Sequence, residues 1–258
     1  MLTFDYNCCI GCGSCARLCP MGYLMMEDGA PHIRERRRCI ECGHCEATCP
    51  KQAISLTPSH GESFCPTAET EAEKLILFRR SVRHFRADPP PREVIQRALD
   101  IAEYAPSGKN AHQHHWTVLY GLEETEKVTE MALDFSARTG NAKELIKIKA
   151  AGTNLLTCDA PCVIIGWSPD DALNPVADTV LALSLVELQL NEAGLGTCWG
   201  GYLRQIADAD AELRAYLGIP EGANMRCALM VGYAKGENYP NLPHRPKAVA
   251  NWISAKPE

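Results

Sequence analysis

The stretch "CIGCGSCARLCP" (Cys9–Pro20) recurs thirty residues later as "CIECGHCEATCP" (Cys39–Pro50). Both copies read C-x2-C-x2-C-x3-C-P, and the first fifty residues hold nine of the fourteen cysteines in the chain. A short loop with this spacing turns three sulfurs toward one [4Fe-4S] cluster, and the cysteine before the proline ligates the other cluster of a pair. The repeat therefore predicts a small domain that binds two [4Fe-4S] clusters.

The crossed rule assigns eight cysteines to the two clusters. One cluster takes its ligands from Cys9, Cys12, Cys15 and Cys49, and the other from Cys39, Cys42, Cys45 and Cys19. Zinc is the competing interpretation, because paired C-x2-C motifs also make tetrahedral thiolate sites. The third cysteine of each run, the C-x3-C-P ending and the duplication all favour iron and sulfide. Cys8 lies outside the repeat, and the sequence assigns it no role.

The composition of the 258 residues is that of a globular protein with a sizeable core, since 46% are hydrophobic and 22% are charged. A net charge of -6 argues against a nucleic-acid binder, which needs a basic surface to neutralise phosphates. The one dense basic run, Arg34–Arg38, is interpreted as a solvated loop or as a docking surface for an acidic redox partner.

The N-terminal residues "MLTFDYNCC" lack the basic and apolar regions of a signal peptide. No apolar run in the sequence approaches the roughly 18 residues that are needed to span a bilayer. We therefore expect a cytoplasmic protein without membrane contact. Cytoplasmic thiols are kept reduced, so this density of cysteine indicates metal binding rather than disulfides.

Composition and periodicity divide the chain into two domains. The repeat fills residues 1–60, a Pro-, Ser-, Thr- and Gly-rich stretch around 61–72 is expected to be a linker, and residues 73–258 form the second domain. Hydrophobic periodicity in the second domain predicts helices over 91–105 and 174–196 and strands over 115–121, 162–167 and 225–234. Helices and strands mixed without a strict βαβ rhythm indicate an α+β fold.

Residues 1–57 resemble bacterial-type two-cluster ferredoxins, and residues 79–245 carry four motifs that resemble the nitroreductase family of FMN flavoproteins, in the family's order. The first motif is "RRSVRHF" (79–85), in which guanidiniums and a hydroxyl within a few residues suit a phosphate dianion. A solvated basic helix end is the alternative interpretation. The resemblance implies that the FMN phosphate is held here, by Arg79, Ser81 and Arg83 with Arg80 beside them.

The second motif is "APSGKNAHQHHW" (105–116), in which Ser107 and Asn110 are expected to contact the flavin. The family usually has a glutamine where His112 stands and a proline at the next position, so His112 is a candidate flavin contact only. His112, His114 and His115 also raise the question of a metal site. No carboxylate or cysteine partner is near in sequence, which favours surface or flavin-facing histidines.

The third motif is "NEAGLGTCWGGY" (191–202), whose glycines let backbone N–H groups approach a planar ligand. The resemblance implies that this segment lies against the isoalloxazine ring, through Thr197, Cys198, Trp199, Gly200 and Gly201. Cys198 is interpreted as a packing residue and not as a nucleophile, because the sequence places no base beside it. In the fourth motif, "GYAKGENYPNLPHRPKAV" (232–249), the resemblance puts Arg245 where the family closes the phosphate site.

Together the resemblances imply a small ferredoxin-like two-cluster domain followed by a nitroreductase-like α+β sandwich. They imply an FMN-dependent oxidoreductase in which electrons from a ferredoxin-type donor or NAD(P)H pass through the clusters to FMN and on to a nitroaromatic, quinone or similar conjugated acceptor. The flavin N5 carries the chemistry in such a protein, so no catalytic side chain is expected. Two alternatives are an electron-transfer relay in which FMN reduces no substrate, and a redox sensor.

The resemblance also implies a homodimer with FMN at the subunit interface. The predicted helix over 174–196 agrees with this, because it is apolar on nearly every face and needs burial on all of them. Its periodicity alone describes the centre of a monomer equally well.

Overall fold

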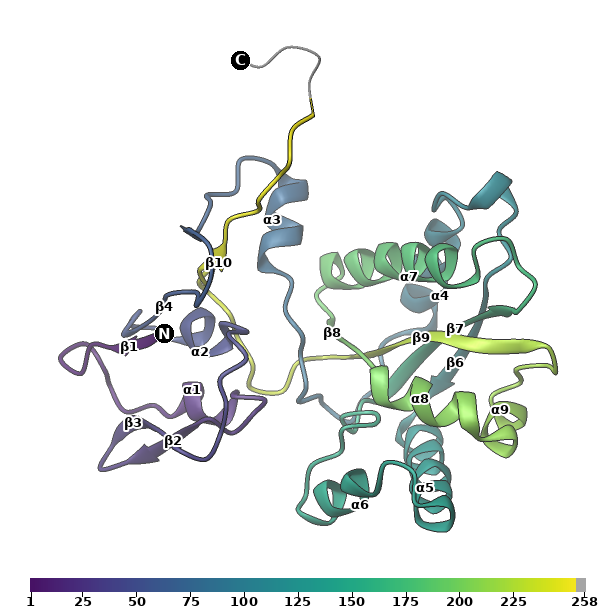
Figure 1. The fold of residues 1–258 in the computed structure, drawn as a ribbon, viewed down its shortest axis with the longest axis horizontal. Coiled ribbons are helices and arrows are strands. Elements are labelled where there is room, and N and C mark those ends of the chain that lie inside the picture. The colour runs from purple at the N-terminus through teal and green to yellow at the C-terminus, as the bar shows by residue number, and fades with distance from the viewer. Residues whose placement is uncertain (254–258) are drawn as a thin grey trace. The chain divides into compact units, whose positions relative to one another are not determined.

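Two compact units make up the chain in the computed structural model, which describes residues 1–253 (Figure 1). The first unit is Met1–Phe78 together with a C-terminal segment that begins at Glu237, and the second is Arg79–Gly236. The sequence predicted a boundary at residues 61–72 and assigned the whole C-terminus to the second domain. The difference arises because the C-terminal strand β10 (Arg245–Pro246) pairs with β5 (Ser63–Phe64), which lies inside the predicted linker.

The first unit is built from short elements around the cysteine repeat. Its strands form two further antiparallel pairs, β1 (Leu2–Phe4) with β4 (Ile54–Leu56) and β2 (Leu24–Glu27) with β3 (Ala30–Ile33). Each cysteine run ends in a short helix, and the unit's helices are α1 (Ser14–Arg17), α2 (His44–Thr48) and α3 (Glu71–Phe78). The helices α1 and α2 both follow a left-handed glycine, so the third cysteine of each run is turned inward and buried.

The second unit is a four-stranded antiparallel sheet with helices on both faces. The strand order is β6-β7-β9-β8, formed by β6 (His115–Tyr120), β7 (Cys162–Pro169), β9 (Ala223–Gly232) and β8 (Gly196–Trp199). Its helices are α4 (Arg92–Ala102), η1 (Gly108–Asn110), α5 (Leu122–Thr139), α6 (Lys143–Ala150), α7 (Pro175–Glu192), α8 (Gly201–Ala209) and α9 (Ala211–Tyr216). The predicted α+β fold is confirmed, and every helix and strand that periodicity predicted is present within a few residues of its expected bounds.

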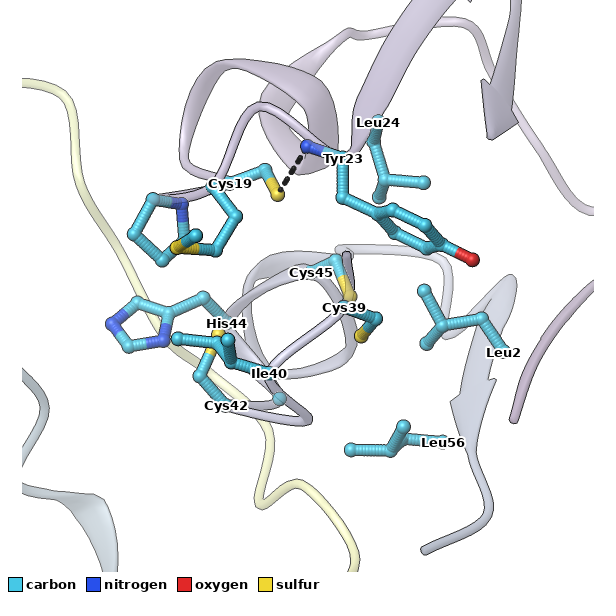
Figure 2. Close-up of a pocket in the computed structure, with 13 residues that line it drawn as sticks. Leu2, Cys19, Tyr23, Leu24, Cys39, Ile40, Cys42, His44, Cys45 and Leu56 are labelled. Carbon is cyan, nitrogen blue, oxygen red and sulfur yellow. Dashed lines mark hydrogen bonds between the residues drawn. The ribbon is translucent and has the colours of Figure 1, made fainter. Parts of the chain in front are cut away.

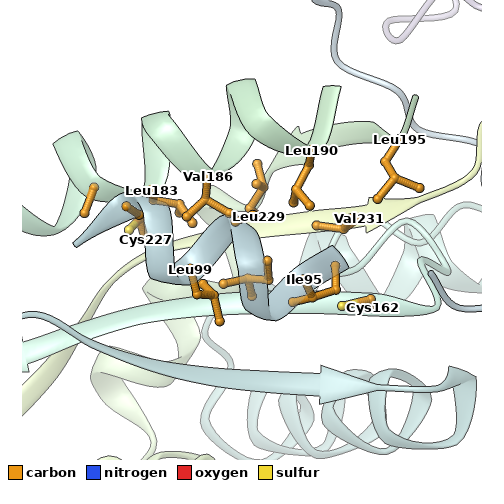
Figure 3. Close-up of a cluster of buried hydrophobic side chains, with 14 of the residues drawn as sticks. Ile95, Leu99, Cys162, Leu183, Val186, Leu190, Leu195, Cys227, Leu229 and Val231 are labelled. Atoms are coloured by element: carbon orange, nitrogen blue, oxygen red, sulfur yellow. The ribbon is translucent and has the colours of Figure 1, made fainter. Parts of the chain in front are cut away.

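A continuous apolar cluster holds α4 and α7 against one face of this sheet (Figure 3). It is made from the buried faces of the two helices and from β7 and β9. Five of its side chains are 0% exposed, those of Leu183, Val186, Leu190, Leu229 and Val231. Burying a Leu or Val side chain stabilises a fold by about 1.5–3 kcal/mol, so these residues fix the position of α7 firmly. The opposite side of α7 leaves Val176 and Leu181 about half exposed, at 48% and 46%.

Within residues 1–253, no helix has both the length and the apolar character that crossing a membrane requires.

Candidate functional site

The second cysteine run lines a cavity in the first unit (Figure 2). Four sulfurs surround this cavity, those of Cys39, Cys42 and Cys45 from the run itself and that of Cys19 from the end of the first run. Its remaining wall is mainly apolar, with Leu2, Tyr23, Leu24, Ile40 and Leu56. The backbone N–H of Tyr23 donates to Sγ of Cys19 at 3.2 Å, and that of Glu41 donates to Sγ of Cys39 at 3.4 Å.

The first cysteine run lines a separate cavity with the same plan. Its four sulfurs belong to Cys9, Cys12, Cys15 and Cys49. The backbone N–H of Ala53 donates to Sγ of Cys49 at 3.3 Å. This bond is equivalent in the repeat to the one from Tyr23 to Cys19, thirty residues earlier. The structure thus brings the eight cysteines together in the two crossed sets that the spacing predicted. Cys8 is exposed and lines neither cavity.

In the part of the chain that the structure describes, no three His, Cys, Asp or Glu side chains are grouped as ligands of one metal ion. The four thiols of each set instead line a cavity. Burial raises the pKa of Cys15 to about 11 and that of Cys45 to about 12, so bound metal must displace their protons.

The C-terminal segment approaches the second cysteine run so closely that Gly43 is required there. A Cβ on Gly43 would collide with the ring of Pro243, whereas a Cβ on the repeat-equivalent Gly13 would meet only Met26, at 3.7 Å. Both glycines have a positive φ, 70° and 73°, so the backbone strain of an alanine is the same at the two positions.

We expect Gly43→Ala to destabilise the first unit by about 2 kcal/mol more than Gly13→Ala, because only Gly43→Ala adds a steric collision. Denaturant unfolding followed by the visible absorbance of the cluster centres measures the difference. Equal losses for the two variants would mean that the C-terminal segment does not pack on Gly43 in solution.

Arg245 lies in this C-terminal segment, which belongs to the first unit, whereas the sequence analysis grouped it with the arginines of "RRSVRHF". Its Nη1 donates to the carbonyl of Glu41 at 2.9 Å and its Nη2 to the carbonyl of Cys42 at 2.6 Å. Both carbonyls belong to the second cysteine run. The guanidinium is therefore bound to the first unit, whereas Arg79, Ser81 and Arg83 belong to the second.

In the second unit, the first and third predicted motifs lie side by side. Ser81 bridges to Thr197 in parallel orientation, and the N–H of Val82 donates to the carbonyl of Thr197 at 2.9 Å. Gly196 makes this approach possible, because a Cβ there would lie 2.8 Å from the side chain of Val82. Ser81 and Val82 thus lie beside the edge strand β8, which brings the predicted phosphate group and the predicted ring-contacting group together.

The residue that joins these two groups is Glu187, which the sequence analysis missed. Its side chain lies on α7, is only 7% exposed and forms an ion pair with Arg79, with 3.1 Å between Oε1 and Nη1. Oε1 also accepts from Oγ1 of Thr197 at 3.0 Å, and Oε2 accepts from Nε1 of Trp199 at 2.9 Å. A carboxylate between apolar residues in the middle of the helix was the signal that could have found it, because a buried charge needs partners.

The other predicted members of this group are close to Cys198. A hydrogen bond from Cys158 and the nearby positive charge of Arg83 lower the pKa of the Cys198 thiol, and the same hydrogen bond with burial raises the pKa of Cys158. Nη1 of Arg83 donates to the carbonyl of Ser81 at 3.3 Å, and Nη1 of Arg80 donates to the carbonyl of Arg79 at 2.6 Å. The sequence did not predict the neighbouring thiol of Cys158.

The two glycines of the third motif differ in what their backbone offers. The N–H of Gly200 donates to the carbonyl of Ala228 at 2.9 Å, so it belongs to the sheet and is not free for a ligand. Gly201 is the first residue of α8, and the N–H groups of a first helical turn have no partner within the helix. The start of α8 is therefore the part of this motif that offers donors to a bound group.

The second predicted motif forms a tight loop at the start of α7. Asp178 accepts from the N–H of Gly108 at 3.0 Å, and Ser107 Oγ accepts from the N–H of His112 at 3.1 Å. Asn110 Oδ1 lies 3.0 Å from Nε2 of His112, while Nδ1 of His112 is buried and has no hydrogen-bond partner among residues 1–253. Such an orphaned nitrogen fits the contact of a bound cofactor.

The three neighbouring histidines point to different partners. Nε2 of His114 lies 3.2 Å from Oε1 of Glu103, and the ring of His115 stacks on Trp167 with 4.5 Å between centroids. His114 is buried, at 5% exposed, and is therefore not the surface histidine that the sequence analysis expected.

The two parts of the predicted flavin site attach to opposite ends of α7. The loop at 107–112 is bonded to Asp178, and the group around Arg79 is bonded to Glu187, nine residues further along. Nine residues of α-helix span about 13.5 Å. One chain therefore holds these two groups, called the two half-sites below, about 13.5 Å apart along α7.

Comparison with known families decides what this unit is. Residues 76–233, well over half of the 258, match the model described as the nitroreductase family. The chain belongs to the nitroreductase family. Residues 1–50 of the same chain match a second model, described as a 4Fe-4S dicluster domain. The predicted family, its oxidoreductase class and the ferredoxin-type N-terminal domain are thereby confirmed.

Individual relatives and structures agree with this membership. A protein of Archaeoglobus fulgidus described as a putative NADH dehydrogenase/NAD(P)H nitroreductase is 30% identical over 168 residues, which cover 65% of this nitroreductase and 87% of the relative. The iodotyrosine deiodinase of Nematostella vectensis is 26% identical over 207 residues, 70% of this chain and 76% of the relative. An FMN-bound nitroreductase structure from Desulfitobacterium hafniense has a TM-score of 0.61 at 23% identity and covers 72% of this chain and all of its own, which shows a shared fold.

Proposed function

We propose that this nitroreductase is an iron-sulfur flavoprotein oxidoreductase with two [4Fe-4S] clusters and FMN. It passes electrons from a ferredoxin-type donor or NAD(P)H to a nitroaromatic, quinone or similar conjugated acceptor. The observation that carries the proposal is the pair of cavities, each surrounded by four thiols, in one chain with a nitroreductase unit. The clusters supply one-electron transfer and FMN supplies the step to two electrons.

The residues that hold FMN are assigned from both half-sites. Ser81 and Arg83, with Arg79 and Arg80, bind the phosphate, and the backbone from Thr197 to Gly201 lies against the ring. Ser107, Asn110 and His112 complete the site, and the orphaned Nδ1 of His112 supports this part. FMN in the structures of related nitroreductases supports the identity of the cofactor. Cys198 is 5% exposed and acts in packing.

The chain acts as a homodimer. Two half-sites at opposite ends of α7 support this, because a two-fold axis across the helix brings the loop of one copy to the arginine group of its partner. The exposed apolar side of α7, with Val176 and Leu181, supports a subunit contact along the same helix.

Within each site, the side chains of the protein orient FMN and take no part in the reaction themselves. Glu187 keeps Arg79 and the indole of Trp199 in place, so that the phosphate end and the ring end are held at a constant separation. The first N–H groups of α8 and its dipole stabilise negative charge that develops nearby. No nucleophile or general base is required of the side chains. The high density of cysteine in the first fifty residues supports a cytoplasmic location, where thiols are kept reduced.

The test is anaerobic reduction of the purified chain with three donors: reduced ferredoxin, NADH and NADPH. We expect about eight irons per chain, and flavin bleaching followed by stoichiometric reduction of a quinone or nitroaromatic acceptor. Zinc in place of iron, or no FMN, would disprove the cofactor assignment. Flavin that is reduced by a donor but never passes electrons to any conjugated acceptor would show a relay and not an enzyme.

A further inference from the structure

The two halves of the cysteine repeat have different surroundings. All five residues of α2 are buried, whereas Cys15 is the one buried residue of the equivalent helix α1. The cover over α2 comes from the C-terminal segment. Thr48 donates from Oγ1 to the carbonyl of Asn238 at 2.8 Å, and Asn241 donates from Nδ2 to the carbonyl of Cys49 at 2.7 Å.

Two further residues of the segment bind the second cysteine run. His244 donates its backbone N–H to Oε2 of Glu46 at 2.9 Å, and its Nδ1 lies 2.7 Å from Oε1 of the same carboxylate. Leu56 donates a third hydrogen bond to that carboxylate, at 3.2 Å. The negative charge of Glu46, beside Cys45, is therefore already held by partners of its own.

Arg245 has no such counter-ion. It is half-buried and donates hydrogen bonds to the neutral carbonyls of Glu41 and Cys42. No carboxylate in residues 1–253 lies within 4.0 Å of its nitrogens. Cys42 lines the cavity of the second run, and Glu41 is the residue whose N–H donates to Sγ of Cys39. The guanidinium thus binds the loop whose Glu41 N–H donates to Sγ of Cys39. It also places a positive charge without a carboxylate partner beside the cavity of the second run.

A positive charge and fixed N–H donors near a cluster favour its reduced, more negative form, which raises its reduction potential. We propose that Arg245 is a positioning residue for the cluster held by Cys39, Cys42, Cys45 and Cys19, and that it raises the potential of this cluster and not of the other. The inference rests on the proposed function, since it requires two clusters. It gives Arg245 a role at the clusters where the family resemblance gave it one at the flavin phosphate.

The test is an anaerobic redox titration of the full chain, in which electron paramagnetic resonance follows each cluster, with iron and FMN assayed on the same samples. In Arg245→Gln we expect the midpoint potential of this cluster to fall by about 59 mV. For a one-electron centre, this means that the ratio of reduced to oxidised cluster falls about tenfold at the midpoint potential of the unchanged protein. The other midpoint, the iron content and the FMN content stay the same. Arg245→Lys keeps the charge and loses the paired hydrogen bonds. We expect the midpoint potential of its cluster to lie between those of Arg245→Gln and the unchanged protein.

Two controls make the result specific. Lys247→Gln removes an exposed positive charge two residues away and moves neither midpoint. Arg83→Ala lowers the FMN content and moves neither midpoint. Unchanged midpoints in Arg245→Gln, or loss of iron from Arg245→Lys, would overturn the inference. Loss of FMN from Arg245→Gln with unchanged midpoints would assign the residue to the flavin instead. An unchanged protein with fewer than two clusters would instead refute the proposed function.

Discussion

Glu187→Ala should destabilise the second unit by about 3 kcal/mol and release most of its FMN, because breaking a buried ion pair leaves the partner uncompensated. Arg79 loses its carboxylate, while Thr197 and Trp199 lose the acceptor of their side-chain hydrogen bonds. Each of these partners belongs to the predicted flavin site. Denaturant unfolding followed by tryptophan fluorescence measures the stability, and the flavin absorbance of the desalted protein measures the occupancy.

Two variants separate the role of the charge from that of the helix. Glu187→Gln keeps an acceptor oxygen and loses the ion pair. We therefore expect its stability and its FMN content to lie between those of Glu187→Ala and the unchanged protein. Glu192→Ala changes an exposed glutamate at the end of the same helix and leaves stability and FMN content unaltered. Full FMN occupancy in Glu187→Ala would show that the carboxylate does not organise the site.

Cys49→Ser should remove the cluster of the first cysteine run and not that of its own run. Cys49 lines the cavity with Cys9, Cys12 and Cys15, so the iron content should fall from about eight to about four per chain. Serine is a poorer iron ligand than a thiolate, so we expect the cluster that depends on Cys49 to be lost and the other cluster to be kept. Iron and sulfide assays give the count, and electron paramagnetic resonance identifies the cluster that remains.

The crossed assignment predicts a pattern among single variants. Cys49→Ser and Cys9→Ser leave the same remaining spectrum, and Cys19→Ser and Cys39→Ser leave the other one. Cys8→Ser keeps both clusters, because Cys8 is exposed and lines neither cavity. If Cys49→Ser and Cys39→Ser removed the same cluster, ligation would follow each run separately and the geometry described above would not hold in solution.

Local sequence patterns predicted the parts of the fold that depend on residues close together in the chain. The cysteine spacing predicted both sets of four thiols, because a short loop can turn its sulfurs in few ways. The apolar periodicity of α7 and β9 predicted those elements, since each buries a face in one core. The family resemblance assigned Ser81 and Thr197 to one flavin site, but their direct contact was not predicted, because nothing local relates residues so far apart.

Long-range polar contacts account for what the sequence analysis missed. Glu187 was unremarked because its three partners lie on other segments and no periodicity marks them. The C-terminal segment was assigned to the wrong partner for the same reason. Its contacts with Glu41, Cys42 and Cys49 are mostly to backbone carbonyls, which every residue type offers and which therefore leave no trace in a sequence.

The return of the C-terminal segment to the first unit has a consequence for biosynthesis. Domains of a nascent chain generally fold in order from the N-terminus. Here the N-terminal unit lacks Asn241, His244 and Arg245 until the whole second unit has left the ribosome. The second cysteine run thus receives these packing contacts only after the second unit has been translated, so that the first unit reaches its final structure late in biosynthesis.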